Sequence, residues 1–524
     1  MKLGPIVSPW QKQHGARIGR RGFIGTTLAA TALAAVHPGR TWATASGSAP
    51  IPNQLAALST AGRPMTLSAT DIKDLRSGLH GSLLLAQDAG YDSARRMWNR
   101  SFDRHPALIA RCADAADVVR AVNFARAHDL RTAVRAGGHS VSGQSVCDGG
   151  LVIDVSQLRA ISVDAQRQVA RAQSGVLLGE LDRATQAAGL ATTLGTVTDT
   201  GIAGLTLGGG MGRLMRKHGL ACDNLRSVDV VTADGKLRHA SVNENPDLFW
   251  ALRGGGGNFG VATSFEYRLH PLAHRVLTGE RVYPFSQARA VFAAAAELAD
   301  RAPDDLTLGA AVFNSVDKDH PGQFAIWSVD YCGDPRDGER LLEPLRKLGT
   351  PLLDTINAVS YLEAQGAAGA ATIAVPSPAG GFVKSGFMRG VTPDMMDELL
   401  RRFVMLPPSM NCSAGLSQMG GAVARVSPEG TAFWNRHAGF DFLINGDWTE
   451  RAQDQRNMQA IRDMWSGLEK FSEGYYVNTE PSEDEHRLRA TYGNNYPRLV
   501  QLKNRYDPTN LFRLNANIKP TAAA

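Results

Sequence analysis

The sequence predicts an α+β fold with more than one domain. Its 524 residues are too many for one ordinary hydrophobic core. Between about residues 70 and 275, alternating strand patterns come with only a few helices, and no regular βαβ repeat is apparent. After Pro271 the composition changes to an alanine-rich helix followed by further alternating strands. A hydrophobic content of 43% and a charged content of 20% are typical of a globular protein.

The first 45 residues have the pattern of an export signal. Arg20 and Arg21 precede an apolar run at residues 23–36, and a small-residue cleavage site follows at residues 43–45. The run, about 14 residues, is shorter than the roughly 20 that span a bilayer. The alternative is a basic N-terminus with a chance pair of arginines. We expect residues 1–45 to be a twin-arginine signal peptide, the mature protein to be periplasmic or secreted, and no stable membrane span to remain.

The charge of the chain gives no support for a nucleic-acid partner. The 56 basic residues exceed the 50 acidic ones by six, and the first 45 residues contain six basic residues and no acidic one. The rest of the chain is therefore formally neutral, whereas binding to a phosphate backbone needs a concentrated basic surface. The five cysteines form no C-x-x-C pair, so the sequence indicates no zinc site and leaves disulfides undecided.

The elements of the first part follow from apolar periodicity and turn residues. We expect a strand and a helix within residues 107–130, strands at 132–135, 151–155 and 169–172, a helix at 178–188, and strands at 227–232 and 261–269. Asp234-Gly235 predicts a hairpin after the strand at 227–232.

The elements of the second part are more helical. We expect helices at 285–300, 338–348, 393–403 and 452–470, strands around 324–331, and a mobile loop at 366–381 that is rich in alanine, glycine and proline. A final segment at 474–520 has turn and helix signals but no obvious partner beside it in the sequence.

Three glycine-rich blocks indicate a large ligand lying against the main chain. The strand at 132–135 runs directly into Gly137-Gly138-His139, where adjacent glycines let consecutive N–H groups point at one anion. Further blocks lie at 195–212 and 252–261. The G-x-G-x-x-G fingerprint of dinucleotide-binding folds is absent from the first block, which disfavours a nicotinamide cofactor.

Several long motifs agree with one family in order and spacing. They are the loop around His139, T-G-I-A-G-L-T-L-G-G-G-M-G at 200–212, C-D-N-L at 222–225, N-P-D-L-F-W-A-L-R-G at 245–254, and the tail motifs at 492–496 and 506–512. Together they resemble the berberine bridge enzyme-like oxidases of the vanillyl-alcohol oxidase/p-cresol methylhydroxylase flavoprotein superfamily, over about residues 70 to 520.

The resemblance implies the cofactor and the domain plan. The cofactor would be FAD, held in a two-part FAD-binding domain at 46–275 with a core at about 103–273. An inserted substrate domain at 276–470 would be an antiparallel sheet with helices over one face. The segment 471–524 would return to the FAD-binding domain.

The resemblance also implies the site residues. His139 takes the place of the histidine that bonds covalently to the 8α carbon of the flavin, and Tyr476 would lie over the flavin ring as the candidate catalytic residue. The other residues expected to bind the cofactor are Arg135, Ala136, Gly137, Gly138, Ser140, Gly143, Thr200, Gly201, Gly204, Gly208, Gly209, Val261, Asn478, Asn515 and Asn517.

Two departures from the family pattern bear on the chemistry. Many relatives have a second covalent link from a cysteine, but Val197 stands at that position, so we expect one covalent bond. Relatives that oxidise alcohols often use the last tyrosine of Y-x-N-Y as the base, and here that position is Thr479. Tyr476, Tyr475 or a carboxylate such as Glu480 remain candidates for the base, and Tyr476 could instead only pack on the flavin.

The function expected is that of an exported FAD-dependent oxidase. It would take a hydride from a small organic substrate, such as an alcohol, a sugar or a secondary metabolite, and pass the electrons to oxygen. The alternatives are a flavin dehydrogenase that uses another electron acceptor and a flavin-carrying protein without turnover. Residues 276–470 contain no motif that identifies the substrate.

Overall fold

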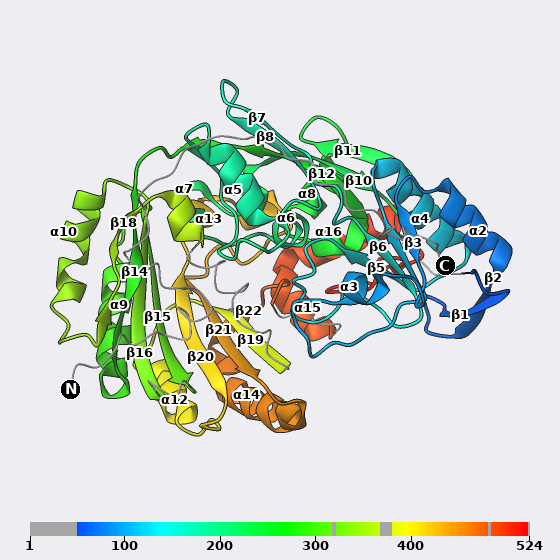
Figure 1. Cartoon of the computed structure of the whole chain (residues 1–524). Helices are drawn as coiled ribbons and strands as arrows, with labels where there is room; N and C mark the ends of the chain where they lie inside the picture. The colour runs from blue at the N-terminus through cyan, green and yellow to red at the C-terminus, as the bar shows by residue number, and fades with distance from the viewer. Residues whose placement is uncertain (1–49, 317–320, 367–379, 480–483, 522–524) are drawn as a thin grey trace, which may run out of the picture.

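The protein has two lobes that face each other across a central region (Figure 1). The computed structural model describes residues 50–316, 321–366, 380–479 and 484–521. The expected signal peptide and nearly all of the expected loop at 366–381 lie outside these ranges. Parallel and antiparallel sheets occur together with packed helices, so the α+β class predicted from the sequence is confirmed.

A small, mostly parallel sheet forms the outer part of the first lobe. Its strands, in spatial order, are β3 (Ser82–Leu84), β4 (Leu108–Arg111), β6 (Leu151–Asp154) and β5 (Thr132–Arg135). Helices α2 (Ala69–Gly78) and α4 (Ala115–Ala127) pack on it through apolar residues such as Ile72 and Val118, and the hairpin of β1 (Gln54–Leu58) and β2 (Pro64–Ser68) lies beside them. Strand β5 ends where the loop of His139 begins.

An antiparallel sheet forms the inner part of the first lobe. Its strands are β11 (Leu237–Ser241), β10 (Leu225–Val231), β12 (Val261–Arg268), β8 (Val169–Gln173) and β7 (Ile161–Asp164). The helices that share its core are α5 (Leu178–Gln186), α6 (Ile202–Leu207), α8 (Pro246–Leu252) and α16 (Tyr496–Tyr506). The second and third glycine-rich blocks connect these elements, so both parts of the lobe border the central region.

One antiparallel sheet forms the second lobe. Its strands, in spatial order, are β17 (Leu353–Asp354), β14 (Val276–Pro284), β16 (Gly322–Tyr331), β15 (Leu306–Ser315), β20 (Asn411–Gln418), β21 (Phe440–Trp448), β19 (Gly380–Met388) and β22 (Ser472–Gly474), with β18 (Asn357–Val359) also paired to β14. The helices on its outer face are α9 (Ala288–Ala299), α10 (Pro335–Arg346), α12 (Pro393–Phe403) and α14 (Asp454–Leu468) (Figure 1).

Strand β21 shows how this sheet separates a core face from an open face. Phe442, Ile444 and Trp448 are buried against the helices. The residues that alternate with them along the strand, such as Asp441 and Asn445, point to the other side, where a cavity lies. The sheet ends at Gly474, so the second lobe extends past residue 470, where we expected the substrate domain to end.

The tail, which is the part of the chain after β22, is held against the first lobe by a buried lysine. Lys503, in α16, is fully buried and pairs with Asp507 at 2.7 Å. Its ammonium group also donates to the carbonyl oxygens of Asn258, at 2.8 Å, and Phe512, at 3.0 Å. The Asp507 carboxylate accepts from the N–H groups of Leu511 and Phe512. These hydrogen bonds explain why the tail motif has an aspartate at the start of its turn and a lysine four residues before it.

In the described part of the chain, every helix is too short or too polar to cross a bilayer. All five cysteines are buried free thiols.

Candidate active site between the two lobes

A cavity of about 1180 Å³ separates the two lobes. This volume exceeds the roughly 300–1,000 Å³ of ordinary small-molecule pockets, so the cavity has room for a large cofactor and a substrate together. The loop after β5, the glycine-rich turn before α6 and the tail form its first wall, and the open face of the second-lobe sheet forms the other.

The glycines of two loops allow their main chains to touch. A Cβ atom at Gly137 would lie 2.3 Å from the amide nitrogen of Gly201, and one at Gly201 would lie 2.6 Å from the amide nitrogen of Gly137. Only glycine fits at both positions, because the clash would be with backbone atoms that cannot turn away. This contact fixes the His139 loop against the turn before α6.

The side chain of His139 lines the cavity between an aromatic and an acidic neighbour. The Trp98 ring stacks on the imidazole with 5.6 Å between ring centroids and 19° between planes. Nε2 of His139 lies 3.3 Å from Oδ2 of Asp199. Cys222, in contrast, is fully buried in an apolar cluster and does not line the cavity, and Val197 at the cavity wall has no thiol.

Most of the residues expected at the cofactor meet at this cavity. Those that line it are Ala136, Gly137, Gly138, His139, Ser140, Thr200, Gly201, Gly204, Tyr476, Asn478 and Asn515. Those that do not line it are Arg135, Gly143, Gly208, Gly209, Val261 and Asn517.

The residues away from the wall support it from behind. Arg135 turns toward Asp154, with 3.6 Å between Nη1 and Oδ1, and Val261 is buried in the core at the start of β12. Asn517 is also buried, and its Oδ1 has no hydrogen-bond partner among the described residues. Gly143 has a left-handed φ of 76°, and the Phe102 ring occupies the space where its side chain would be.

Gly208 and Gly209 make room for side chains from later segments of the chain instead of lining the cavity. A Cβ at Gly208 would lie 2.2 Å from Oδ1 of Asn478, and one at Gly209 would lie 2.9 Å from the Phe433 ring. The Asn478 side chain can therefore reach the Leu205 carbonyl oxygen, to which it donates at 3.0 Å. The glycine pair thus places Asn478 and Tyr476 at the cavity.

The wall of the first lobe fits FAD. A Cβ at Gly204 would meet no atom within 4 Å, so the main chain there borders open space that a ring could fill. Oδ1 of Asn515 lines the cavity and is buried without a hydrogen-bond partner in the described structure. Such an atom is satisfied when a bound group donates to it, as the NH of an isoalloxazine can.

The Tyr476 hydroxyl is buried and accepts hydrogen bonds from two donors. The N–H of Gly210 donates to it at 3.0 Å, and the Asn478 side-chain amide donates at 2.8 Å. Burial raises the pKa of Tyr476 to about 12, although both donors act to lower it. A phenol with so high a pKa is a poor base near neutral pH.

Asp441, in β21, offers a carboxylate that our sequence reasoning missed. It lines the cavity, and its Oδ1 is buried with no hydrogen-bond partner among the described residues. Burial raises the pKa of Asp441 to about 7, and its charge contributes to the raised pKa of Tyr476, so the two groups are neighbours. In the sequence, Asp441 looks like any polar residue on the exposed face of an alternating strand.

Neither Thr479 nor Tyr475 is placed to act as the base. Thr479 lines the cavity, but its hydroxyl is hydrogen-bonded to the Ser385 hydroxyl at 2.6 Å and has no basic character. Tyr475 does not line the cavity and donates to Glu469 at 2.8 Å. Glu480 lies outside the described residues.

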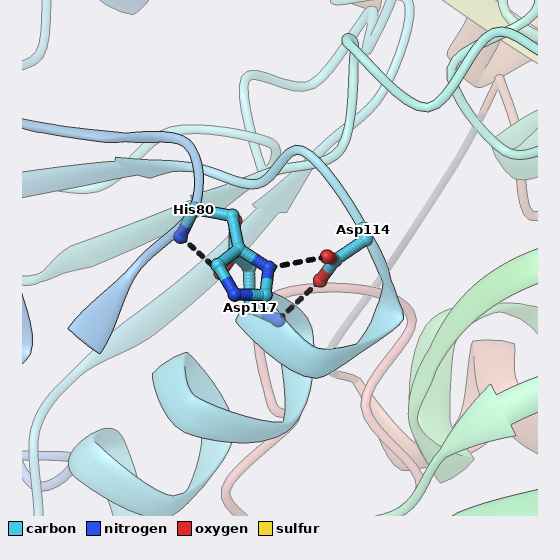
Figure 2. A group of neighbouring side chains, drawn as sticks. All are labelled: His80, Asp114 and Asp117. Carbon is cyan, nitrogen blue, oxygen red and sulfur yellow. Dashed lines mark hydrogen bonds and ion pairs between the residues drawn. The ribbon is translucent and has the colours of Figure 1, made fainter.

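A cluster of His80, Asp114 and Asp117 has side chains close enough to hold a metal, but its geometry is that of a helix cap (Figure 2). The Asp117 carboxylate accepts from the backbone N–H groups of His80 and Gly81, both at 2.8 Å, and of Ala113, at 2.9 Å. Asp114 accepts from the Asp117 N–H and contacts Nδ1 of His80 at 2.6 Å. Asp114 therefore caps the first turn of α4, and Asp117 holds the neighbouring main chain of His80, Gly81 and Ala113.

Comparisons with known proteins agree with this geometry. The family model described as FAD binding domain matches residues 106–241, and the one described as berberine and berberine like matches residues 475–519. The uncharacterized FAD-linked oxidoreductase YgaK of Bacillus subtilis is 32% identical, over 85% of this chain and 98% of that protein. The (R)-6-hydroxynicotine oxidase of Paenarthrobacter nicotinovorans is 30% identical, over 84% of this chain and 97% of that protein.

Solved structures share the fold. The crystal structure of 6-hydroxy-D-nicotine oxidase from Arthrobacter nicotinovorans has a TM-score of 0.77 and 27% identity, and the match covers 84% of this chain and 98% of that one. Physcomitrella patens BBE-like 1 has a TM-score of 0.78 at 22% identity, covering 86% of this chain and all of that one, which shows the fold alone. The family expected from the motifs is confirmed: this chain belongs to the berberine bridge enzyme-like FAD-linked oxidoreductases of the vanillyl-alcohol oxidase superfamily.

Proposed function

We propose that this protein is an exported oxidase that holds FAD through one covalent bond from His139 and oxidises a small organic substrate, with Asp441 as the base. The observation that carries the proposal is the pair of groups on opposite walls of one cavity. His139 lines the first-lobe wall, and Asp441, whose Oδ1 has no hydrogen-bond partner among the described residues, lines the sheet wall beside Tyr476.

The residues of the first lobe would hold the cofactor. The main chain of the Gly137–Gly138 turn and of the Thr200–Gly201 turn would face its pyrophosphate, and Asn515 would face its ring. When bound, FAD supplies the acceptor for the hydride. The absence of a thiol at Val197 supports a single covalent link.

The residues of the second lobe would bind the substrate and take its proton. With a pKa of about 7, Asp441 is partly ionised near neutral pH and can accept a proton from a substrate hydroxyl or amine. The Tyr476 hydroxyl, which already accepts from Gly210 and Asn478, has its own proton available to donate to the substrate or to Asp441. In the proposal Tyr476 therefore orients the reacting group, and Asp441 removes the proton.

Related proteins support a small organic substrate and oxygen as the acceptor. The relative from Paenarthrobacter nicotinovorans is named an oxidase of a hydroxynicotine, and a structural neighbour is named a chitooligosaccharide oxidase. We keep the substrate class broad, as an alcohol, a sugar or a secondary metabolite. The proposal of export rests on Arg20, Arg21 and the apolar run that follows them.

A screen of alcohols, sugars and amines for bleaching of the flavin without air tests the function. A substrate should bleach the flavin, and admitted oxygen should restore the colour and yield hydrogen peroxide. Slow recovery in oxygen with fast recovery by an artificial acceptor would show a dehydrogenase. The precipitated, acid-treated protein should stay yellow, and the His139→Ala variant should release its flavin. A separate experiment tests export. Replacing Arg20 and Arg21 with lysine should retain the precursor in the cytoplasm.

A further inference from the structure

We propose that Asp199 is a positioning residue that prepares His139 to form its bond with the flavin. The inference rests on the proposed covalent link through His139. It assigns a role to a side chain that neither the glycine motif nor the oxidation of substrate requires. Three contacts of the His139 imidazole and its loop support this role.

The first contact is between the two side chains. Nε2 of His139 lies 3.3 Å from Oδ2 of Asp199. The His139 side chain is 16% exposed and the Asp199 side chain 31% exposed, so solvent screens their interaction only in part. A carboxylate at this distance favours the imidazole tautomer that has its hydrogen on Nε2, which leaves the lone pair on Nδ1.

The second contact fixes the distance between the loops. Asp199 stands two residues before Gly201, and His139 stands two residues after Gly137. These glycines touch through their main chains, as the 2.3 Å approach of a Cβ placed at Gly137 to the Gly201 nitrogen shows. The carboxylate therefore reaches the imidazole from a rigid neighbouring turn.

The third contact holds the ring from its face. The Trp98 indole stacks on the imidazole, and the Trp98 backbone N–H donates to the Gly138 carbonyl oxygen at 2.9 Å. Stacking on Trp98 limits rotation of the imidazole ring, while Asp199 selects Nε2 as the nitrogen that carries the hydrogen. Together they present Nδ1 as the nucleophile.

The bond-forming step balances with oxygen as the oxidant. Nδ1 forms a bond to the carbon of the flavin 8-methyl group, and one hydrogen leaves that carbon as a proton. Asp199 stabilises the positive charge that the imidazole gains, and the imidazole then loses its Nε2 proton to water. The two electrons of the broken C–H bond pass through the ring system to oxygen, which takes up two protons and becomes hydrogen peroxide.

The test measures the rate of attachment rather than turnover. Flavin-free protein from riboflavin-limited cells is mixed with FAD in air, and flavin fluorescence on the polypeptide is followed on denaturing gels. We expect Asp199→Asn and Asp199→Ser to attach flavin roughly tenfold to a hundredfold more slowly than the parent. Asp199→Glu, which keeps a carboxylate, should recover part of the rate. Asp164→Asn, at the exposed end of β7 and away from the cavity, should attach at the parent's rate.

Each outcome has a defined meaning. Attachment at the parent's rate in a folded Asp199→Asn or Asp199→Ser variant would overturn the role of Asp199 and leave the His139 link standing. A parent protein that binds FAD but never attaches it would overturn the proposed link itself. Melting temperature and reversible FAD binding are measured on the same samples. A fall in attachment no larger than the loss of bound FAD would make Asp199 a structural residue and contradict the proposal.

Discussion

The two walls of the cavity are built in different ways. The first-lobe wall is largely main chain, because turns such as Gly137–Gly138 and Thr200–Gly201 bring backbone atoms to the surface. The sheet wall is made of side chains at alternate positions of strands, as Asp441, Leu443 and Asn445 show in β21. A cofactor shared by a whole family can be bound by main chain, whereas a particular substrate has to be recognised by side chains.

The largest expected effect of a single substitution lies on the sheet wall. Asp441→Asn keeps the size of the side chain and removes its basicity, so we expect anaerobic flavin reduction by a substrate to slow by about 10²–10⁴-fold. Tyr476→Phe should slow it less, by roughly tenfold, because it removes an orienting hydroxyl rather than the base. Stopped-flow absorbance measures both rates.

The flavin content of these two variants should equal that of the parent, because neither substitution changes His139 or the glycine turns that would hold the cofactor. If Tyr476→Phe slows reduction more than Asp441→Asn does, then Tyr476 is the base and Asp441 is not.

A pair of glycine variants sharpens the comparison on the other wall. Gly137→Ala places a methyl group against the Gly201 backbone, and we expect a loss of about 1–3 kcal/mol or more in the free energy of unfolding. Gly204→Ala meets no protein atom, and in α6 it should gain about 0.5–1 kcal/mol.

The methyl group that Gly204→Ala adds nevertheless enters the cavity. We therefore expect this variant to be more stable than the parent and to bind FAD more weakly. Calorimetry of the flavin-free variants and titration with FAD measure the two effects. Unchanged FAD affinity in Gly204→Ala would mean that the cofactor does not lie against this turn.

A smaller effect is expected where the lobes meet. The His218 and His270 rings stack with 3.8 Å between centroids, and burial lowers the pKa of His218 to about 4 and also lowers that of His270. The folded protein keeps both rings neutral, while the unfolded chain takes up protons below about pH 6.5. Stability should therefore fall as the pH drops from about 6.5 toward 4.

His218→Phe keeps a buried ring that does not titrate. We expect its melting temperature to fall by fewer degrees than the parent's over the same pH range. Equal falls in the two proteins would show that other groups cause the loss.

The sequence predicted the first wall far better than the second. Glycines that let main chains touch have no substitute, so Gly137, Gly138 and Gly201 identify their loop in the sequence. Six expected residues nevertheless do not line the cavity: Gly208 and Gly209 make room for side chains from distant segments, and Arg135, Gly143, Val261 and Asn517 lie away from the wall.

The sheet wall could not be predicted at the same level. Its strands alternate as any half-buried strand does, and Asp441 reaches the cavity because β21 lies between β20 and β19 in a sheet whose order is not apparent in the sequence. Its raised pKa depends on burial in the folded protein, which no local sequence pattern contains.

The pH dependence of anaerobic flavin reduction tests the central claim most directly. The claim is that a carboxylate on the sheet wall removes the proton while the flavin on the opposite wall takes the hydride. With a pKa of about 7 for Asp441, the rate in the parent should rise about tenfold per pH unit below 7 and level off above it. The Asp441→Asn variant should be slow and show no bend near pH 7. A parent rate that does not change between about pH 5 and about pH 9, or the same bend in the variant, would contradict the account.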